Sequence, residues 1–128
     1  MSTAKISWGI TPAERAELAY QEGQKLELRC EFQKATEYYL EAVKQDKKAQ
    51  YQYKLAYVYS QLKPPKLKEA INQLKSLLKI DSKYKNAYSL LGRLYLQQGE
   101  FKKAETAFEK ALNIDKKFAE PQFFLGEL

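Results

Sequence analysis

The 128-residue sequence contains no histidine, a single cysteine, and few glycines and prolines. Without histidine the chain lacks the commonest general base and the commonest metal ligand, so we expect neither catalysis nor a metal site. The one cysteine, Cys30, permits no internal disulfide, and we expect its thiol to be buried or half-buried. No glycine-rich phosphate loop is present, and we expect no cofactor.

Long apolar runs are also missing from the sequence. No stretch of about 18 apolar residues appears, so we expect no membrane span. Residues 1–10 lack the basic region and apolar core of a secretory signal, which makes the cytoplasm the default expectation for location. The low glycine and proline content favours helices, because helix interiors exclude both residues. Ten Tyr and six Phe then indicate aromatic packing between helices or on a binding face.

Three segments of the sequence align with one another at a period of 34 to 35 residues. Each contains an alanine, a large apolar residue four positions later, and an aspartate near its end. The aligned alanines are Ala35, Ala70 and Ala104. A repeat of this length predicts stacked helical hairpins, since one hairpin cannot bury its apolar faces alone.

The third segment carries the most complete pattern, reading Tyr88, Leu91-Gly92, Tyr95, Ala104 and Phe108. This fits the pattern W-x2-L-G-x2-Y…A-x3-F with Tyr in the Trp position, so the chain resembles the tetratricopeptide repeat family over about residues 12–128. The resemblance implies an all-α, right-handed solenoid of helix–turn–helix hairpins. We place an N-terminal tail at 1–11, and repeats at 12–48, 49–84 and 85–118, with a partial fourth at 119–128.

Small and aromatic residues in the third repeat have separate expected roles. Gly92 and Ala104 should lie where the two helices of the hairpin cross closely. Gly99 should end the first helix in the left-handed conformation, which glycine adopts without strain. Three aromatic residues should fill the space between this hairpin and its neighbours: Tyr95, Phe101 and Phe108.

The other two turns depart from this pattern. The first repeat has Cys30 in the position of Gly99, so its turn must close without glycine. The second turn is two residues longer and contains Pro64-Pro65, which ends the preceding helix. At the start of the first repeat, Thr11 and Glu14 predict a capping box, with Pro12 at the first helical position.

Both ends of the chain carry apolar residues. Ile6, Trp8 and Ile10 predict a tail that is disordered or packed on the first helix. The sequence stops inside the fourth repeat, and we expect Phe123, Phe124 and Leu128 to leave an apolar end face. We favour the interpretation that the chain is a fragment of a longer protein, with coverage of that face by self-association as the alternative.

In proteins of the family that the chain resembles, the first helix of each hairpin lines a concave peptide-binding groove. The resemblance places polar and aromatic side chains there, a mixture that suits an extended peptide. The expected groove residues are Tyr20, Gln21, Gln24 and Glu27, then Tyr53, Lys54, Tyr57 and Gln61, then Asn86, Ser89, Leu90, Arg93 and Gln97.

Some members of the family grip the acidic C-terminus of Hsp70 or Hsp90 through a two-carboxylate clamp. The clamp requires Lys and Asn, then Asn, then Lys and Arg on three successive first helices. The corresponding residues here are Tyr20 and Gln24, then Lys54, then Asn86 and Leu90. None of them matches, so Lys54 and Arg93 are expected to attract an acidic peptide only by other means.

The net charge of +6 is concentrated in the middle of the chain, where residues 44–85 carry eleven lysines and three acidic residues. This block has no arginine and no RNA-binding motif, so we rank nucleic acid below an acidic protein surface as a partner. We therefore expect a protein-binding adaptor or scaffold in a larger assembly. The alternative is a protein that oligomerises through the ends of its solenoid.

Overall fold

The computed structural model describes residues 9–127, which fold into seven α-helices without a β-strand among them. The prediction of an all-α solenoid is confirmed. The tail residues Ile6 and Trp8 and the C-terminal Leu128 lie outside the described residues, whereas Ile10 is half-buried. The helices are α2 (Pro12–Leu28), α3 (Phe32–Gln45), α4 (Ala49–Gln61), α5 (Leu67–Ile80), α6 (Lys85–Gln97), α7 (Phe101–Ile114) and α8 (Ala119–Glu127).

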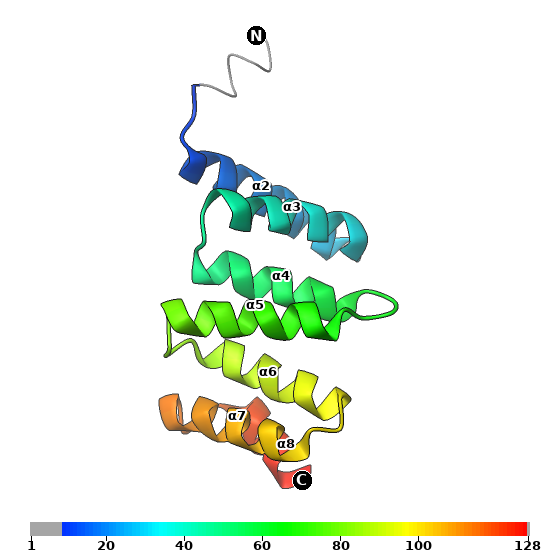
Figure 1. Ribbon diagram of the computed structural model, residues 1–128, viewed down its shortest axis with the longest axis vertical. Helices are drawn as coiled ribbons and strands as arrows, with labels where there is room; N and C mark the ends of the chain where they lie inside the picture. Colours follow the sequence, from blue (N-terminus) through cyan, green and yellow to red (C-terminus); the bar gives the residue numbers. More distant parts are fainter. Residues whose placement is uncertain (1–8, 128) are drawn as a thin grey trace.

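The helices form three antiparallel hairpins that stack along the long axis of the molecule (Figure 1). The hairpins are α2–α3, α4–α5 and α6–α7, and α8 packs against the last of them. Among the first helices, α4 contacts α6 and α6 contacts α8, whereas the second helices α5 and α7 do not approach each other as closely. The stack therefore curves, with first helices on its inner side.

The first helix begins where the sequence predicts. The hydroxyl of Thr11 accepts a hydrogen bond of 3.1 Å from the backbone N–H of Glu14, and the Glu14 carboxylate accepts one of 2.9 Å from the N–H of Thr11. Pro12 occupies the first helical position, where no backbone donor is needed. The predicted capping box is confirmed.

Two of the hairpin turns close in the same way although their residues differ. Gly99 has a φ of 78°, as expected, and Cys30 has a φ of 58° in the equivalent position. In each turn the next residue donates back to the preceding helix, from Glu31 N–H to Leu26 and from Glu100 N–H to Tyr95. Cys30 therefore carries the conformational strain that glycine avoids. Its side chain is exposed, so the prediction of a buried or half-buried thiol is wrong.

Close contact inside each outer hairpin depends on a glycine in the first helix. A Cβ added at Gly92 would stand 2.5 Å from the Phe108 ring, and one at Gly23 would stand 2.6 Å from the Tyr39 ring. The expected close crossing at Gly92 is confirmed, with Phe108 as the group that needs the space. Since both rings are fully buried, the glycines set the separation of the paired helices.

The core consists of two clusters of buried apolar side chains. One is formed by the first hairpin and α4, and includes Tyr39, Tyr51 and Leu55. The other extends from α4 to α7 and includes Ala56 and Phe108. Helix α4 belongs to both clusters, so the two halves of the stack share it.

Of the three aromatic residues expected in the core of the third repeat, two are buried and one is exposed. Tyr95 and Phe108 are buried, which confirms two of the three predictions. Phe101 is 60% exposed, so its predicted place between hairpins is wrong. It is the first residue of α7 and comes directly after the turn.

Candidate functional site

The residues predicted to bind a peptide lie on the first helices α2, α4 and α6, and we call their surface the first-helix face. Three of these residues, Tyr20, Ser89 and Leu90, are almost wholly buried and belong to the support beneath the surface. Glu27, Tyr53, Lys54, Tyr57, Gln61 and Arg93 are half-buried, and the exposed members are Gln21, Gln24, Asn86 and Gln97.

The cation of the middle first helix is already paired within the chain. The Nζ of Lys54 lies 3.2 Å from a carboxylate oxygen of Glu27, with the two side chains 28% and 19% exposed. The other Glu27 oxygen accepts a hydrogen bond of 2.6 Å from the hydroxyl of Tyr39. The carboxylate thus joins the first hairpin to α4, and Lys54 is not free to meet a ligand.

Arg93 is paired more loosely, with a residue of the partial fourth repeat. Its guanidinium lies 3.9 Å from a carboxylate oxygen of Glu120 on α8, and the buried hydroxyl of Ser89 donates to the other oxygen of the same carboxylate. The position of Glu120 in the repeat did not indicate this pairing, because Glu120 lies on α8 and Arg93 lies on α6 of the preceding hairpin. Both cations expected to attract an acidic peptide therefore have a carboxylate of the chain nearby, closely for Lys54 and more loosely for Arg93.

Tyrosines form a buried cluster beneath the first-helix face of hairpin one. The ring of Tyr20 lies 4.8 Å from that of Tyr51 and 5.7 Å from that of Tyr39, measured between centroids. Gln50 donates to the Tyr20 hydroxyl, and the Tyr51 hydroxyl donates to Glu17 at 2.8 Å. Burial is the main cause that raises the pKa of Tyr20, Tyr39 and Tyr51, so all three rings stay neutral at physiological pH.

A second tyrosine pair lies between hairpins two and three. The ring centroids of Tyr53 and Tyr84 are 5.6 Å apart, and burial raises the pKa of Tyr53 to about 12. Nearby, the Lys54 ammonium lies 5.8 Å from the centroid of the Tyr57 ring. The middle of the first-helix face thus offers aromatic surface and neutral hydroxyls in place of free charge.

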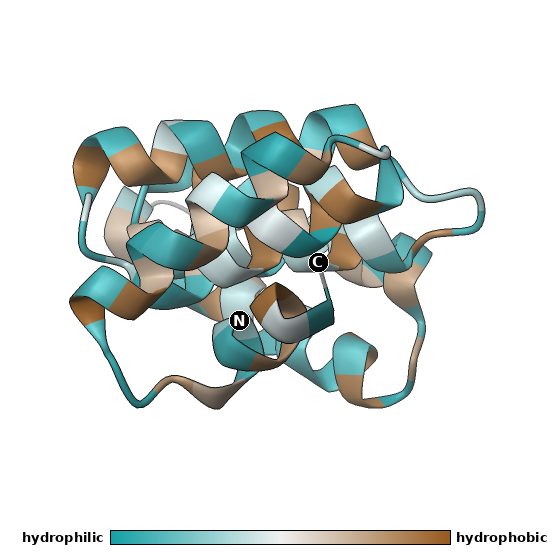
Figure 2. Cartoon of the chain, turned by 90° about the horizontal axis from the view of Figure 1, so that it is seen from below, coloured by the Kyte–Doolittle hydropathy of each residue, from teal (hydrophilic) through white to brown (hydrophobic). Residues whose placement is uncertain are grey.

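The C-terminal end of the stack exposes apolar surface on α8, which carries apolar colouring near the C-terminus in Figure 2. Phe123 is 63% exposed, whereas Phe124 stacks on Phe108 at a centroid distance of 5.3 Å. The third residue expected at this face, Leu128, lies outside the described residues. Phe123 is thus the main apolar side chain that α8 presents to solvent.

Residues 9–127 contain neither a metal-binding cluster nor a membrane-crossing helix. Within this range no group of three or more His, Cys, Asp or Glu residues could hold a metal ion. No helix in the same range has the length and apolar character needed to cross a membrane.

Sequence and structure comparisons identify similar proteins. Residues 66–125 match the sequence profile of the family described as tetratricopeptide repeat. The TPR domain of Arabidopsis OM64 gives a TM-score of 0.86 at 21% identity, covering 91% of this chain and 95% of that one. A comparison with curated protein sequences found no match.

Two further similar structures are described with bound peptides. The first TPR domain of Spaghetti (RPAP3), bound to the HSP90 peptide SRMEEVD, gives a TM-score of 0.85 at 19% identity over 90% of both chains. The second TPR domain of human RPAP3, in complex with the HSP70 peptide SGPTIEEVD, gives 0.84 at 20% identity, covering 91% of this chain and 96% of that one. At these identities the likeness shows the fold.

Proposed function

Because the chain carries tetratricopeptide repeats, we propose that it is a protein-interaction adaptor that binds a segment of a partner protein on its first-helix face. The single observation that carries the proposal is the row of polar side chains on successive first helices that the core does not use. Gln24 on α2 and Asn86 and Gln97 on α6 are exposed, with Tyr53 and Tyr57 half-buried between them on α4.

The chemistry of this face favours an uncharged, extended segment. Carboxamides both donate and accept, so they can satisfy the backbone of a peptide that has no partner strand. The half-buried tyrosines add contact area with a polar tip. Since Lys54 and Arg93 are paired with Glu27 and Glu120, an acidic ligand would have to displace a carboxylate of the chain itself.

This preference differs from that of the two similar structures described with chaperone peptides. Both of those peptides end in EEVD. Tyr20 and Leu90 occupy two of the five clamp positions and are buried, and Lys54 at a third is ion-paired. We therefore propose that the ligand is recognised through its backbone and neutral side chains, not through terminal carboxylates.

The test begins with peptides selected for binding to the purified chain from a random display library. Their sites are then mapped by amide chemical shifts. The proposal expects the shifts to gather on α2, α4 and α6. It also expects the Gln24→Ala/Asn86→Ala variant to weaken binding by about thirtyfold, because two hydrogen bonds are lost and each contributes on the order of 1 kcal/mol.

A matched control changes the same residue types on second helices. Gln33 on α3 and Asn72 on α5 are exposed, and the Gln33→Ala/Asn72→Ala variant should bind as the unaltered chain does. Equal losses in the two variants, or shifts confined to α3, α5 and α7, would show that the first-helix face is not the site.

The exposed ring of Phe123 favours a second candidate function, in which α8 contacts another copy of the chain. A dimer through this end would shield Phe123 and extend the stack. Sedimentation velocity over a concentration series distinguishes the two functions: the dimer should appear as concentration rises and should be lost in Phe123→Ser. A monomer at every concentration removes this candidate and leaves the first proposal standing.

A further inference from the structure

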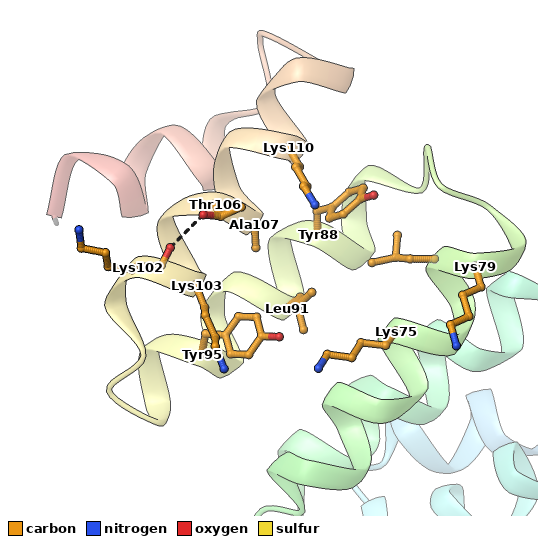
Figure 3. Close-up of a pocket in the computed structure, with 11 residues that line it drawn as sticks. Lys75, Lys79, Tyr88, Leu91, Tyr95, Lys102, Lys103, Thr106, Ala107 and Lys110 are labelled. Atoms are coloured by element: carbon orange, nitrogen blue, oxygen red, sulfur yellow. Dashed lines mark hydrogen bonds between the residues drawn. The ribbon is translucent and has the colours of Figure 1, made fainter.

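The outer side of the stack contains a cleft of about 650 Å³ between α5 and α7 (Figure 3). One wall carries Lys75 and Lys79 from α5, and the other carries Lys102, Lys103 and Lys110 from α7. None of the residues that line the cleft is acidic. The cleft therefore brings together lysines from the second and third repeats, which are far apart in the sequence.

The lysines of this cleft are largely without carboxylate partners. Over the part of the chain that the structure describes, Lys75, Lys79 and Lys110 take part in none of the ion pairs. Lys103 lies 3.8 Å from Glu100, but both side chains are about half exposed or more, so water screens that pair. On the first-helix face, by contrast, Lys54 pairs closely with Glu27, at 3.2 Å between two half-buried side chains.

The floor of the cleft is apolar. It is formed by α6, through Tyr88, Leu91 and Tyr95, with Leu78 and Ala107 on the two walls. Figure 3 shows Leu91 and the two tyrosines lying between the lysine-bearing helices. A cleft of this volume is within the range of pockets that take a ligand group, here an apolar side chain surrounded by ammonium groups.

Three of the five lysines are specific to this cleft, and the other two recur one repeat earlier. One period earlier, between α3 and α5, Lys44 and Lys68 stand at the positions of Lys79 and Lys102. The positions of Lys75, Lys103 and Lys110 are occupied there by Leu40, Glu69 and Ser76. The junction between hairpins two and three is therefore more basic than the one before it, because Lys75, Lys103 and Lys110 have no lysine counterpart there.

We propose that the cleft between α5 and α7 binds an acidic protein segment that inserts one apolar or aromatic residue between its carboxylates. The carboxylates pair with the lysines of both walls, and the inserted side chain covers Leu91 and the edges of the tyrosines. This surface is separate from the first-helix face, so the chain can hold two different segments at once.

An acidic protein segment fits this cleft better than a nucleic acid does. Binding of single strands commonly uses aromatic faces on which bases stack. Here the Lys103 ammonium lies 5.7 Å from the centroid of the Tyr95 ring, and that of Lys110 lies 5.9 Å from the centroid of Tyr88. A base that stacked on either of these ring faces would have to displace a lysine, and the apolar Leu91 of the floor offers no hydrogen-bond donor to a phosphate.

The test measures fluorescence anisotropy with a labelled synthetic helix of Glu and Ala that has a central Leu-Phe pair. We expect Lys75→Glu/Lys110→Glu to weaken binding about tenfold or more, because two attractive contacts become repulsive. The control Lys63→Glu/Lys66→Glu changes net charge equally in an exposed loop and should lose no more than about twofold, since distant exposed charges are screened.

Three further probes make the result decisive. Binding should fall when Gln replaces Glu in the peptide and when Ser replaces its Leu-Phe pair, and a single-stranded uridine oligonucleotide should bind more weakly. The Gln24→Ala/Asn86→Ala variant should bind the acidic peptide unchanged, which separates this proposal from the one for the first-helix face. Absence of peptide binding, equal losses in the two lysine variants, or tighter binding of the oligonucleotide would overturn the proposal.

Discussion

Gly92 lies so close to the ring of Phe108 that a Cβ at this glycine would stand 2.5 Å from one ring carbon and 2.7 Å from two others. Phe108 is fully buried and also stacks on Phe124, so its ring has little space into which to move. The same relationship occurs between Gly23 and Tyr39 in the first hairpin. In each outer hairpin, one hydrogen atom in place of a methyl group sets how closely two helices pack.

Replacing Gly92 by alanine should therefore destabilise the fold, although alanine favours helices. Overpacking of a filled core costs about 1–3 kcal/mol, and the helix propensity of alanine offsets about 1 kcal/mol of that. Urea unfolding should show a net loss for Gly92→Ala. Gly126→Ala is the matched control, because a Cβ there meets nothing within 4 Å, and its stability should be unchanged or slightly higher. A Gly92→Ala variant as stable as the control would contradict the close packing.

The turn at Cys30 should become more stable when glycine replaces the cysteine. The φ of 58° costs a side-chain-bearing residue about 1 kcal/mol, which glycine does not incur. Cys30→Gly should therefore raise the free energy of unfolding by about that amount, and Gly99→Ala should lower it similarly. Both are measured by thermal and urea unfolding. An unchanged stability in both variants would mean that these turns relax without strain.

Removing the carboxylate of Glu27 should lower the free energy of unfolding, because its two partners would lose their acceptor. Glu27→Ala leaves the Tyr39 hydroxyl and the Lys54 ammonium without an acceptor, which should cost about 1–3 kcal/mol in unfolding free energy. Glu27→Gln should cost less, because its amide oxygen still accepts from Tyr39. The Gln variant also frees Lys54, so it should bind acidic peptides on the first-helix face more tightly. Identical losses in the two variants would argue against the role assigned to the carboxylate.

Alkaline pH should destabilise the chain partly through Tyr53. Burial raises the pKa of Tyr53 from 10.0 to about 12. Between these two pH values Tyr53 ionises in the unfolded chain but stays protonated in the folded chain. Stability should be unaffected by this group below pH 10 and should fall as pH rises from there towards about 12. In Tyr53→Phe the fall should be smaller by about 2 kcal/mol over this interval, measured by urea unfolding. Parallel pH curves for the two chains would show that Tyr53 ionises as an exposed tyrosine does.

The fold could be predicted from the sequence because its signals are local and repeated. Alanine and glycine recur at positions that only close helix packing explains, and Thr11 and Glu14 are near enough in the chain to predict a cap. The position of Cys30 relative to Gly99 likewise predicted a turn without glycine. Phe101 shows the limit of such reasoning, because a family pattern fixes a residue's place on a helix but not how far the neighbouring helices reach to cover it.

The electrostatics of the candidate site could not be predicted in the same way. Lys54 and Arg93 have carboxylate partners from other hairpins, Glu27 and Glu120, and sequence phase does not indicate pairing between repeats. Charge counted along the chain placed the basic excess in residues 44–85. Lys103 and Lys110 belong to residues 86–128, which carry six basic and six acidic residues. In three dimensions they complete the α5–α7 cleft, because their acidic neighbours in sequence do not line it.

Helix α4 contributes side chains to both core clusters, whereas Pro121 is the one buried residue within the described part of α8. A stack built in this way should come apart by fraying, with the C-terminal helix detaching long before the centre loosens. Unfolding of either half would expose the α4 side chains that it buries, and so would weaken the packing of the central helix. Because α4 is packed on both sides, its backbone amides should be the last to exchange their hydrogens with solvent.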